Sequence, residues 1–160
     1  MLRHNVICTL LALFLVACTT QSVSKHPDFS GRWIIDKVNT KLQFLNISSL
    51  QRGIVVIEHH EPTFKFTRTF TVTGKDNTFS YELTTDGKEV VTQSGGQEQH
   101  SRLYWDGDQL VFVMRIVAAD GESTNTVHYM LIAGGSQLQG EESFRGSSTN
   151  YDNLWILTGE

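Results

Sequence analysis

The amino-acid sequence predicts an all-β fold, and three observations lead to this prediction. From residue 29 onward, runs rich in Val, Ile, Thr, Phe and Tyr follow one another along the chain. Turn signals such as Asp86-Gly87 and Asp106-Gly107 separate these runs about every ten to fifteen residues, which is the spacing of hairpins with short turns. With 160 residues, the chain is long enough for one domain with its own core.

Ten strands are expected in order along the chain. They cover residues 30–36, 54–60, 63–73, 78–84, 88–93, 98–105, 109–117, 124–133, 137–144 and 152–158. After the first strand, Val38, Leu42 and Leu45 recur at spacings near three to four, which is typical of a short amphipathic helix or a packed loop. Because an antiparallel sheet must protect its edges, the predicted architecture is an up-and-down barrel of about 8–10 strands with this one short helix. A β-sandwich is the alternative.

The first 17 residues are typical of a signal peptide. Arg3 supplies positive charge, and the apolar stretch from Val6 to Ala17 is shorter than the roughly 20 residues that a membrane-spanning helix needs. The stretch ends in Leu15-Val16-Ala17-Cys18, which resembles the bacterial lipobox. That resemblance implies cleavage before Cys18 and acylation of this cysteine with fatty-acyl chains such as palmitate. An ordinary secretory signal or a plain membrane anchor is the alternative.

The expected organisation is a signal peptide over residues 1–17, a lipidated tether over 18–27 and a barrel domain over 28–160. Cys18 is the only cysteine outside the signal peptide, so its acylation leaves the mature protein without a thiol or a disulfide. Each buried lipid methylene contributes about 0.8 kcal/mol, and several chains together anchor a protein stably. Thr19 stands where an aspartate would resemble an inner-membrane retention signal. The expected location is therefore the bacterial cell envelope, on the outer membrane and facing the periplasm.

Charge and motif content exclude several classes of function. The formal net charge is −4, and the 13 basic and 17 acidic residues are interspersed, so no basic surface for nucleic acid is expected. The sequence contains no nucleophile elbow, zinc-protease helix motif or phosphate-binding glycine loop. His59 and His60 are adjacent on a predicted strand, so they point to opposite faces and do not chelate one ion together. The sequence thus implies no metal, no cofactor and no catalytic residues.

The segment Asp28-Phe29-Ser30-Gly31-Arg32-Trp33 opens the first predicted strand. Its Gly-x-Trp motif resembles that of the lipocalin and fatty-acid-binding superfamily, the calycins, whose first strand carries the motif near the closed end of the barrel. Two further motifs, Thr85-Asp86-Gly87-Lys88-Glu89 and Trp105-Asp106-Gly107-Asp108-Gln109-Leu110-Val111, are similar to those of uncharacterised bacterial lipocalin-like proteins. The resemblance implies a lipocalin-like barrel in which Trp33 is a structural plug and Arg145, the late arginine, packs across it.

The strand over residues 63–73 has the clearest alternation of apolar and polar residues, and Arg68 falls on its apolar face. Because burying an unpaired charge is costly, an inward arginine requires a carboxylate, waters or an anionic ligand head group. A bulge that reverses the register, or a position at the rim, is the alternative. Arg115 raises the same question on a strand whose two faces are both apolar. The residues expected to bind ligand are Phe64, Phe66, Arg68, Phe70, Tyr81 and Arg115.

These observations favour a lipoprotein that is anchored to the membrane by its lipid and binds a small ligand without catalysis. The expected ligand is apolar or amphipathic, and it is fatty-acid-like or otherwise anionic if it contacts Arg68. The main alternative is a structural lipoprotein whose barrel is filled by side chains and whose loops bind an envelope protein. An enzyme on the barrel scaffold is a third hypothesis, which a buried cluster joining His100 or His128 to a carboxylate would favour.

Overall fold

The structure is a computed structural model, and it describes residues 26–43 and 45–160. The signal peptide, Cys18 and most of the tether lie outside the described residues. The strands are β1 (Gly31–Ile35), β2 (Leu50–His60), β3 (Thr63–Val72), β4 (Lys75–Thr84), β5 (Val90–Ser94), β6 (Gln97–Asp106), β7 (Gln109–Ala118), β8 (Gly121–Ile132), β9 (Gln137–Gly146) and β10 (Asn150–Gly159). Each of the ten strands predicted from the sequence has its counterpart here.

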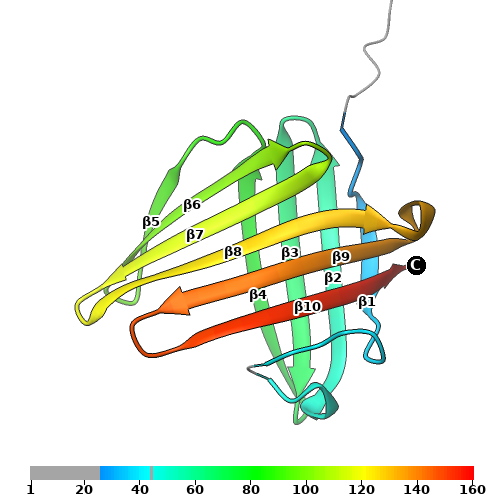
Figure 1. The fold of residues 1–160 in the computed structure, drawn as a ribbon, viewed down its shortest axis with the longest axis horizontal. Helices are drawn as coiled ribbons and strands as arrows, with labels where there is room; N and C mark the ends of the chain where they lie inside the picture. Colours follow the sequence, from blue (N-terminus) through cyan, green and yellow to red (C-terminus); the bar gives the residue numbers. More distant parts are fainter. Residues whose placement is uncertain (1–25, 44) are drawn as a thin grey trace, which may run out of the picture.

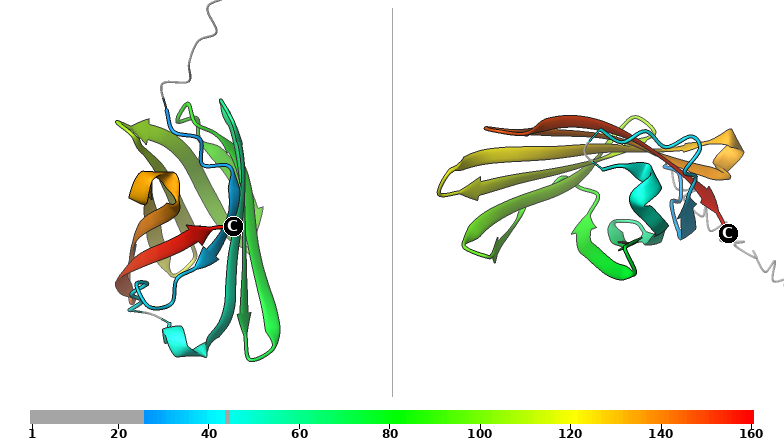
Figure 2. Two further views of the ribbon diagram at one scale, coloured as in Figure 1. Left: turned by 90° about the vertical axis from the view of Figure 1, so that its right-hand side faces the viewer. Right: turned by 90° about the horizontal axis from the view of Figure 1, so that it is seen from below.

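All ten strands belong to one antiparallel sheet, in the order β4-β3-β2-β1-β10-β9-β8-β7-β6-β5. β1 pairs with both β2 and β10, so the first and last strands lie side by side (Figure 1). Figure 2 shows that the sheet curls until β2–β4 face β7–β10 as two layers. β4 then contacts β6 near a bridge between Asp86 and Tyr104, which nearly closes the ring. The predicted all-β, up-and-down barrel is therefore confirmed, with ten strands.

The described residues between β1 and β2, 36–43 and 45–49, form a loop with one short 3-10 turn, η1 (Ile47–Ser49). The backbones of Lys41 and Leu154 exchange two hydrogen bonds of 2.8 Å, so the loop runs along β10 beyond the end of the short β1. The Thr40 hydroxyl is buried there and donates to the Ile156 carbonyl oxygen at 3.1 Å. Val38 is 90% exposed, so the apolar spacing in this segment does not mark a buried helical face. Of the two readings of the segment, the packed loop is the closer.

Close packing around one indole ring explains the Gly31-Arg32-Trp33 motif. Gly31 has a φ of +149°, and a Cβ atom there would lie 3.4 Å from Nε1 of Trp33. On β10, a Cβ atom at Gly159 would likewise lie 3.4 Å from the Trp33 ring. Trp33 is 4% exposed, and its indole N–H donates to the Phe29 carbonyl oxygen at 3.1 Å. Trp33 and Phe29 thus fill one end of the barrel, which we call the closed end.

The hydrophobic core continues from the closed end between the two layers. Phe29, Phe64, Leu103 and Leu110 are each 0% exposed. Their side chains come from the start of the domain, β3, β6 and β7, so the core joins both layers. Among the described residues, no helix has the length and apolar character needed to cross a bilayer.

Candidate functional site

The closed end carries a network of polar side chains around Glu61. This carboxylate accepts hydrogen bonds from Thr85 Oγ1 at 2.5 Å, Trp105 Nε1 at 2.8 Å and His59 Nε2 at 3.1 Å. His59 is 4% exposed, and its Nδ1 accepts from the Phe29 amide at 3.3 Å, which favours the tautomer with its proton on Nε2. Burial alone would raise the pKa of Glu61, but the three hydrogen bonds outweigh it and lower the pKa. These groups satisfy one another, and none of them lines either of the two spaces described next.

A small cavity of about 50 Å³ lies deeper in the barrel, between the two layers. We call it the inner cavity. Tyr81 fills the space beside it by stacking on Phe112, with 4.4 Å between ring centroids, and on Phe66, with 5.1 Å. A volume of this size holds a few water molecules, whereas ligand sites measure roughly 300–1,000 Å³. Most of the deep interior is therefore filled by aromatic side chains.

The inner cavity continues into a larger and mainly apolar space of about 640 Å³ at the other end of the barrel. We call this space the mouth groove. Arg68, Phe70, Glu142 and Trp155 line both spaces and mark their junction. Phe70 and Trp155 stack there with 5.3 Å between ring centroids, and Leu45 reaches the groove from the loop that precedes β2. Because its volume falls in the range of ligand sites, the mouth groove is the candidate functional site.

Arg68 is the only basic group that the two spaces share among the described residues. It lies opposite Val55 on β2 and Phe79 on β4 in an unbroken register, which points its side chain inward. The guanidinium carbon lies 4.5 Å from the ring centroid of Phe70 and 5.5 Å from that of Phe79, so both aromatic faces attract the cation. Its buried Nε has no hydrogen-bond partner, and no carboxylate in the described part of the chain lies within 4.0 Å of Arg68. The predicted inward arginine is thus present and has unused donors.

Two polar acceptors face the same spaces. Glu142 on β9 is 9% exposed, and its Oε2 accepts from Asn153 Nδ2 and Trp155 Nε1, both at 2.8 Å. Both bonds use Oε2, and Oε1 of Glu142 makes no hydrogen bond to the described residues. Asn125 on β8 lines the inner cavity, and its buried Oδ1 has no partner. The site therefore combines an unused cationic donor with two unused acceptors.

The hydroxyls of Tyr81 and Tyr129 lie close together at the inner cavity. They interact, although the Tyr81 hydroxyl has no hydrogen bond of regular geometry. Burial is the largest cause that raises the pKa of both phenols, so both stay protonated at neutral pH. They are neutral groups that can donate or accept a hydrogen bond, and they add no charge to the site.

The structure separates the aromatic residues that the sequence assigns to ligand binding. Phe70 lines both the inner cavity and the mouth groove, as Arg68 does. Phe66 and Tyr81 line the inner cavity but not the mouth groove. Phe64 is fully buried in the closed end and lines neither space. Its ring packs against closed-end side chains, so its position is that of a core residue.

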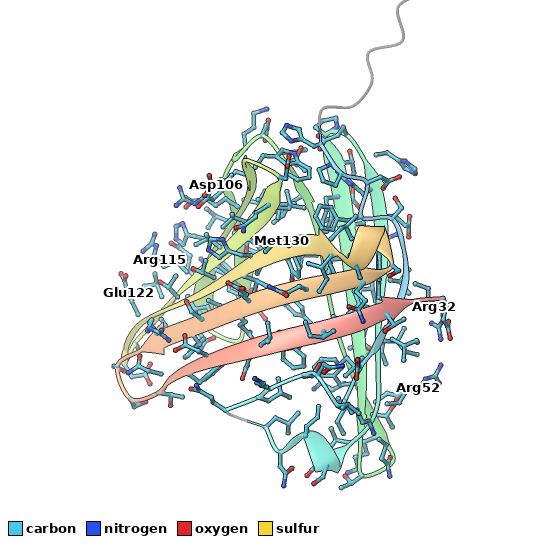
Figure 3. The ribbon with its side chains drawn as sticks, turned by 45° about the vertical axis from the view of Figure 1, so that its right-hand side comes forward. Arg32, Arg52, Asp106, Arg115, Glu122 and Met130 are labelled. Carbon is cyan, nitrogen blue, oxygen red and sulfur yellow. The ribbon has the colours of Figure 1, made fainter. Side chains whose placement is uncertain are left out.

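Arg115 does not face the cavity. It lies on the outer side of β7, where its Nη1 is 3.4 Å from Oε1 of Glu122, and Figure 3 shows the two residues beside each other at the edge of the molecule. The preceding residue, Met114, packs against the core, and alternation along the strand therefore turns Arg115 outward. The expectation that Arg115 contacts a ligand in the barrel is not supported by this placement.

Arg145 does not pack across Trp33. It lies near the far end of β9, where it donates to Oδ1 of Asp152 at 2.6 Å and to the Tyr151 carbonyl oxygen at 2.9 Å. Trp33 pairs with Gly159 at the opposite end of β10. The length of β10 thus separates the two side chains, and glycines rather than an arginine flank the indole.

Among the described residues, the only buried histidine that contacts a carboxylate is His59, which bonds Glu61 in the closed-end network. No other histidine forms a buried cluster of the kind that would favour an enzyme within this part of the chain. His100 contacts Glu89 at 3.0 Å and Glu98 at 2.5 Å. The hydrogen bond to Glu89 is the largest cause that raises the pKa of His100, and the bond to Glu98 raises it further. Both carboxylates are exposed, so this is a surface cluster. His128 contacts Gln109 at 3.2 Å. In residues 26–43 and 45–160, no group of three or more His, Cys, Asp and Glu residues is placed to hold a metal ion.

Sequence reasoning missed several residues of the site, among them Asn125, Glu142 and Trp155. A signal for Glu142 was present, since Leu138, Gly140 and Glu142 alternate along one strand and share its inner face. The sequence offers no comparable signal for Asn125, because the polar residues around it alternate with other polar residues.

Comparisons with known proteins identify the fold. No protein-family model matches the chain, and no curated protein matches it in sequence. Solved structures do match: zebrafish ileal bile acid-binding protein complexed with cholic acid has a TM-score of 0.53 at 12% identity, covering 82% of this chain and 98% of that one. A secretory abundant heat soluble protein from Ramazzottius varieornatus also has a TM-score of 0.53 at 12% identity, with 82% and 94% covered. Human cRBP IV has a TM-score of 0.50 at 15% identity, with 81% and 97% covered.

These similarities, together with the ten-stranded order, define the class of fold. The chain has a calycin-type β-barrel fold with minimal helix content. At such low sequence identity the likeness concerns the fold alone, and function must be argued from the site.

Proposed function

We propose that this protein is a lipid-anchored lipoprotein of the bacterial envelope whose barrel binds a small amphipathic ligand. The observation that carries the proposal is the Arg68 guanidinium, which lies at the junction of the inner cavity and the mouth groove without a carboxylate partner among the described residues. A polar head group at this junction would satisfy the guanidinium, while the apolar part of the ligand would occupy the mouth groove. The proposal includes no catalytic step.

The architecture supports the ligand-binding part of this proposal. A similar structure carries cholic acid, an amphipathic molecule, in its complex. The volume of the mouth groove, about 640 Å³, suits a ligand of that general size. The inner cavity of about 50 Å³ is too small for such a ligand. The proposed ligand therefore lies mainly in the mouth groove and not deep in the barrel.

Native mass spectrometry tests the proposal. The chain from residue 21 onward would be incubated with lipid extracts, and bound molecules would be detected as added mass. We expect wild type to retain added mass and Arg68→Met to lose it. A wild-type barrel that never retains added mass would refute ligand binding.

The membrane anchor is tested separately. Replacing the acylated thiol, Cys18→Ser, is expected to release the protein from membranes or to leave an uncleaved precursor, because the lipid would no longer be attached. Fractionation and labelling with a radioactive fatty acid would measure this. Continued labelling of the variant would show that Cys18 is not the acylated residue.

The small inner cavity also favours a second candidate function, a filled barrel that binds an envelope protein through its loops. In that case Arg68→Met would leave bound mass unchanged because there would be none. Crosslinking in intact envelopes would then recover a protein partner.

A further inference from the structure

The proposed ligand site contains both signs of charge, and this balance defines its head group more narrowly. Arg68 and Glu142 line the inner cavity and the mouth groove alike. Lys75 and Asp76 add one charge of each sign to the wall of the groove. The fixed charges of the site therefore cancel, and an anionic head group would add an uncompensated charge beside a buried carboxylate.

Arg68 and Glu142 do not neutralise each other by direct contact. Within the described residues, no Arg68 nitrogen lies within 4.0 Å of a Glu142 oxygen. Both charges nevertheless act on the same neighbour: burial raises the pKa of Tyr151 most, the Glu142 carboxylate raises it further, and the Arg68 guanidinium lowers it. The two side chains thus face a common space from opposite layers, one on β3 and the other on β9.

The unused hydrogen-bonding groups show the same division. Nε of Arg68 is a donor without a partner, and it requires an acceptor. Oε1 of Glu142 is left over because both bonds from Asn153 and Trp155 go to Oε2. Oδ1 of Asn125 is a buried acceptor without a partner among the described residues, so it requires a donor, and Oε1 of Glu142 is free to accept from one. One head group that accepts on one side and donates on the other would satisfy all three.

We infer that the ligand is zwitterionic: an amphipathic molecule with an anionic group at Arg68 and a primary ammonium at Glu142 and Asn125. Phosphoethanolamine head groups and amino-acid head groups belong to this chemical class. The inference rests on the proposed function, because it concerns the head group of the same ligand. The inference goes beyond the proposed function because it excludes simple fatty acids as the preferred ligand. A carboxylate alone would leave the acceptors of Glu142 and Asn125 unpaired.

Competition between matched lipids tests the inference. The full chain, purified in an alkyl maltoside at one fixed concentration, would be mixed with lauroyl lysophosphatidylethanolamine, lauroyl lysophosphatidylglycerol and laurate. Native mass spectrometry resolves the three bound species in one sample. Because a hydrogen bond to a charged group contributes about 1.5–3 kcal/mol, we expect the ethanolamine lipid to exceed the glycerol lipid roughly tenfold or more.

Variants of the acceptors make the test specific. Glu142→Gln removes the charge while keeping an oxygen for Asn153 and Trp155, and it is expected to abolish or reverse the preference for the ethanolamine lipid. Glu141→Gln is the matched control, because Glu141 is the exposed neighbour on the outer face of β9 and should leave the preference unchanged. If urea denaturation shows that Glu142→Gln does not fold, Asn125→Leu serves as the second variant. It is expected to reduce the preference for the ethanolamine lipid over the glycerol lipid.

The outcomes separate this inference from the proposed function. Equal binding of all three lipids by wild type, or a preference that survives Glu142→Gln, would overturn the zwitterionic head group while leaving ligand binding intact. A preference for laurate over the ethanolamine lipid that Arg68→Gln abolishes would do the same. If wild type binds none of the three probes, both the inference and the proposed function fail.

Discussion

The two ends of the barrel treat polar side chains in opposite ways. At the closed end, Glu61 receives three hydrogen bonds, and the buried His59 is bonded at both ring nitrogens. We call the part of the barrel around the inner cavity and the mouth groove the open end; there, Arg68, Asn125 and Glu142 each retain a group that no described residue satisfies. Polar groups in the network around Glu61 are therefore satisfied by one another, whereas several polar groups at the other end have no partner among the described residues.

This difference indicates which end serves stability and which serves binding. Buried polar groups in folded proteins are normally satisfied, because an unpaired group costs about 1–3 kcal/mol. A cluster of unsatisfied groups beside a groove is therefore typical of a site that a ligand completes. Substitutions at the closed end should change stability, whereas substitutions at the open end should change binding.

The largest expected effect comes from the closed-end core. Phe64→Ala removes a fully buried ring and should lower the free energy of unfolding by about 3–5 kcal/mol, because it creates a cavity in close-packed surroundings. Urea denaturation measures this value. A change below about 1 kcal/mol would show that the closed end is not the stable part of the barrel.

Removing the acceptor of the closed-end network should have a smaller effect. Glu61→Ala leaves donors on the buried His59 and Thr85 unpaired and should lower the free energy of unfolding by roughly 1–2 kcal/mol. Glu58→Ala is the matched control, because Glu58 is exposed on β2 and its carboxylate pairs, within the described part of the chain, with the exposed Lys65 alone, at 3.3 Å. Equal losses in the two variants would contradict a special role for the network.

The same carboxylate predicts a pH dependence. Because hydrogen bonds lower the pKa of Glu61 in the folded protein, its stabilisation is fully present above the unfolded pKa of about 4.3 and is lost as the pH falls through the lower, folded value. Wild type should therefore lose more stability than Glu61→Ala below about pH 4.3. Thermal melts of both proteins from neutral to acid pH would measure the difference, and parallel curves would refute it.

The smallest change in stability is expected at the open end. Arg68→Met replaces a half-buried cation, whose buried Nε has no partner among the described residues, by an apolar chain of similar length, so the free energy of unfolding should stay the same or rise by about 1 kcal/mol. Ligand binding should fall at the same time. A clear loss of stability would mean that Arg68 supports the fold and that its position at the groove is incidental.

The fold could be predicted from the sequence to a large extent because its signals are local. Turn residues placed all ten strands, and the regular alternation of β3 turned Arg68 inward. The outward orientation of Arg115 could not be predicted, because both faces of β7 are apolar and no alternation marks the inner face. A local signal of this kind fails wherever neighbouring positions have the same polarity.

The errors that remain depend on long-range register. Whether Arg145 reaches Trp33 depends on how far along β9 and β10 each lies, and the pairing places Arg145 opposite Asn150, far from Gly159. The polar closed-end network also joins segments that are distant in sequence, since Glu61 and Trp105 meet only in the folded barrel. Neither spacing nor composition determines such contacts.

The most direct test of the account compares how a ligand stabilises wild type and Arg68→Met. With lauroyl lysophosphatidylethanolamine at about one hundred times its dissociation constant, mass action should raise the free energy of unfolding of wild type by about 2.7 kcal/mol. Arg68→Met, folded equally well, should gain far less at the same concentration. Equal gains in the two proteins, or no gain in wild type, would contradict the claim that the open end of this barrel is a ligand site organised by Arg68.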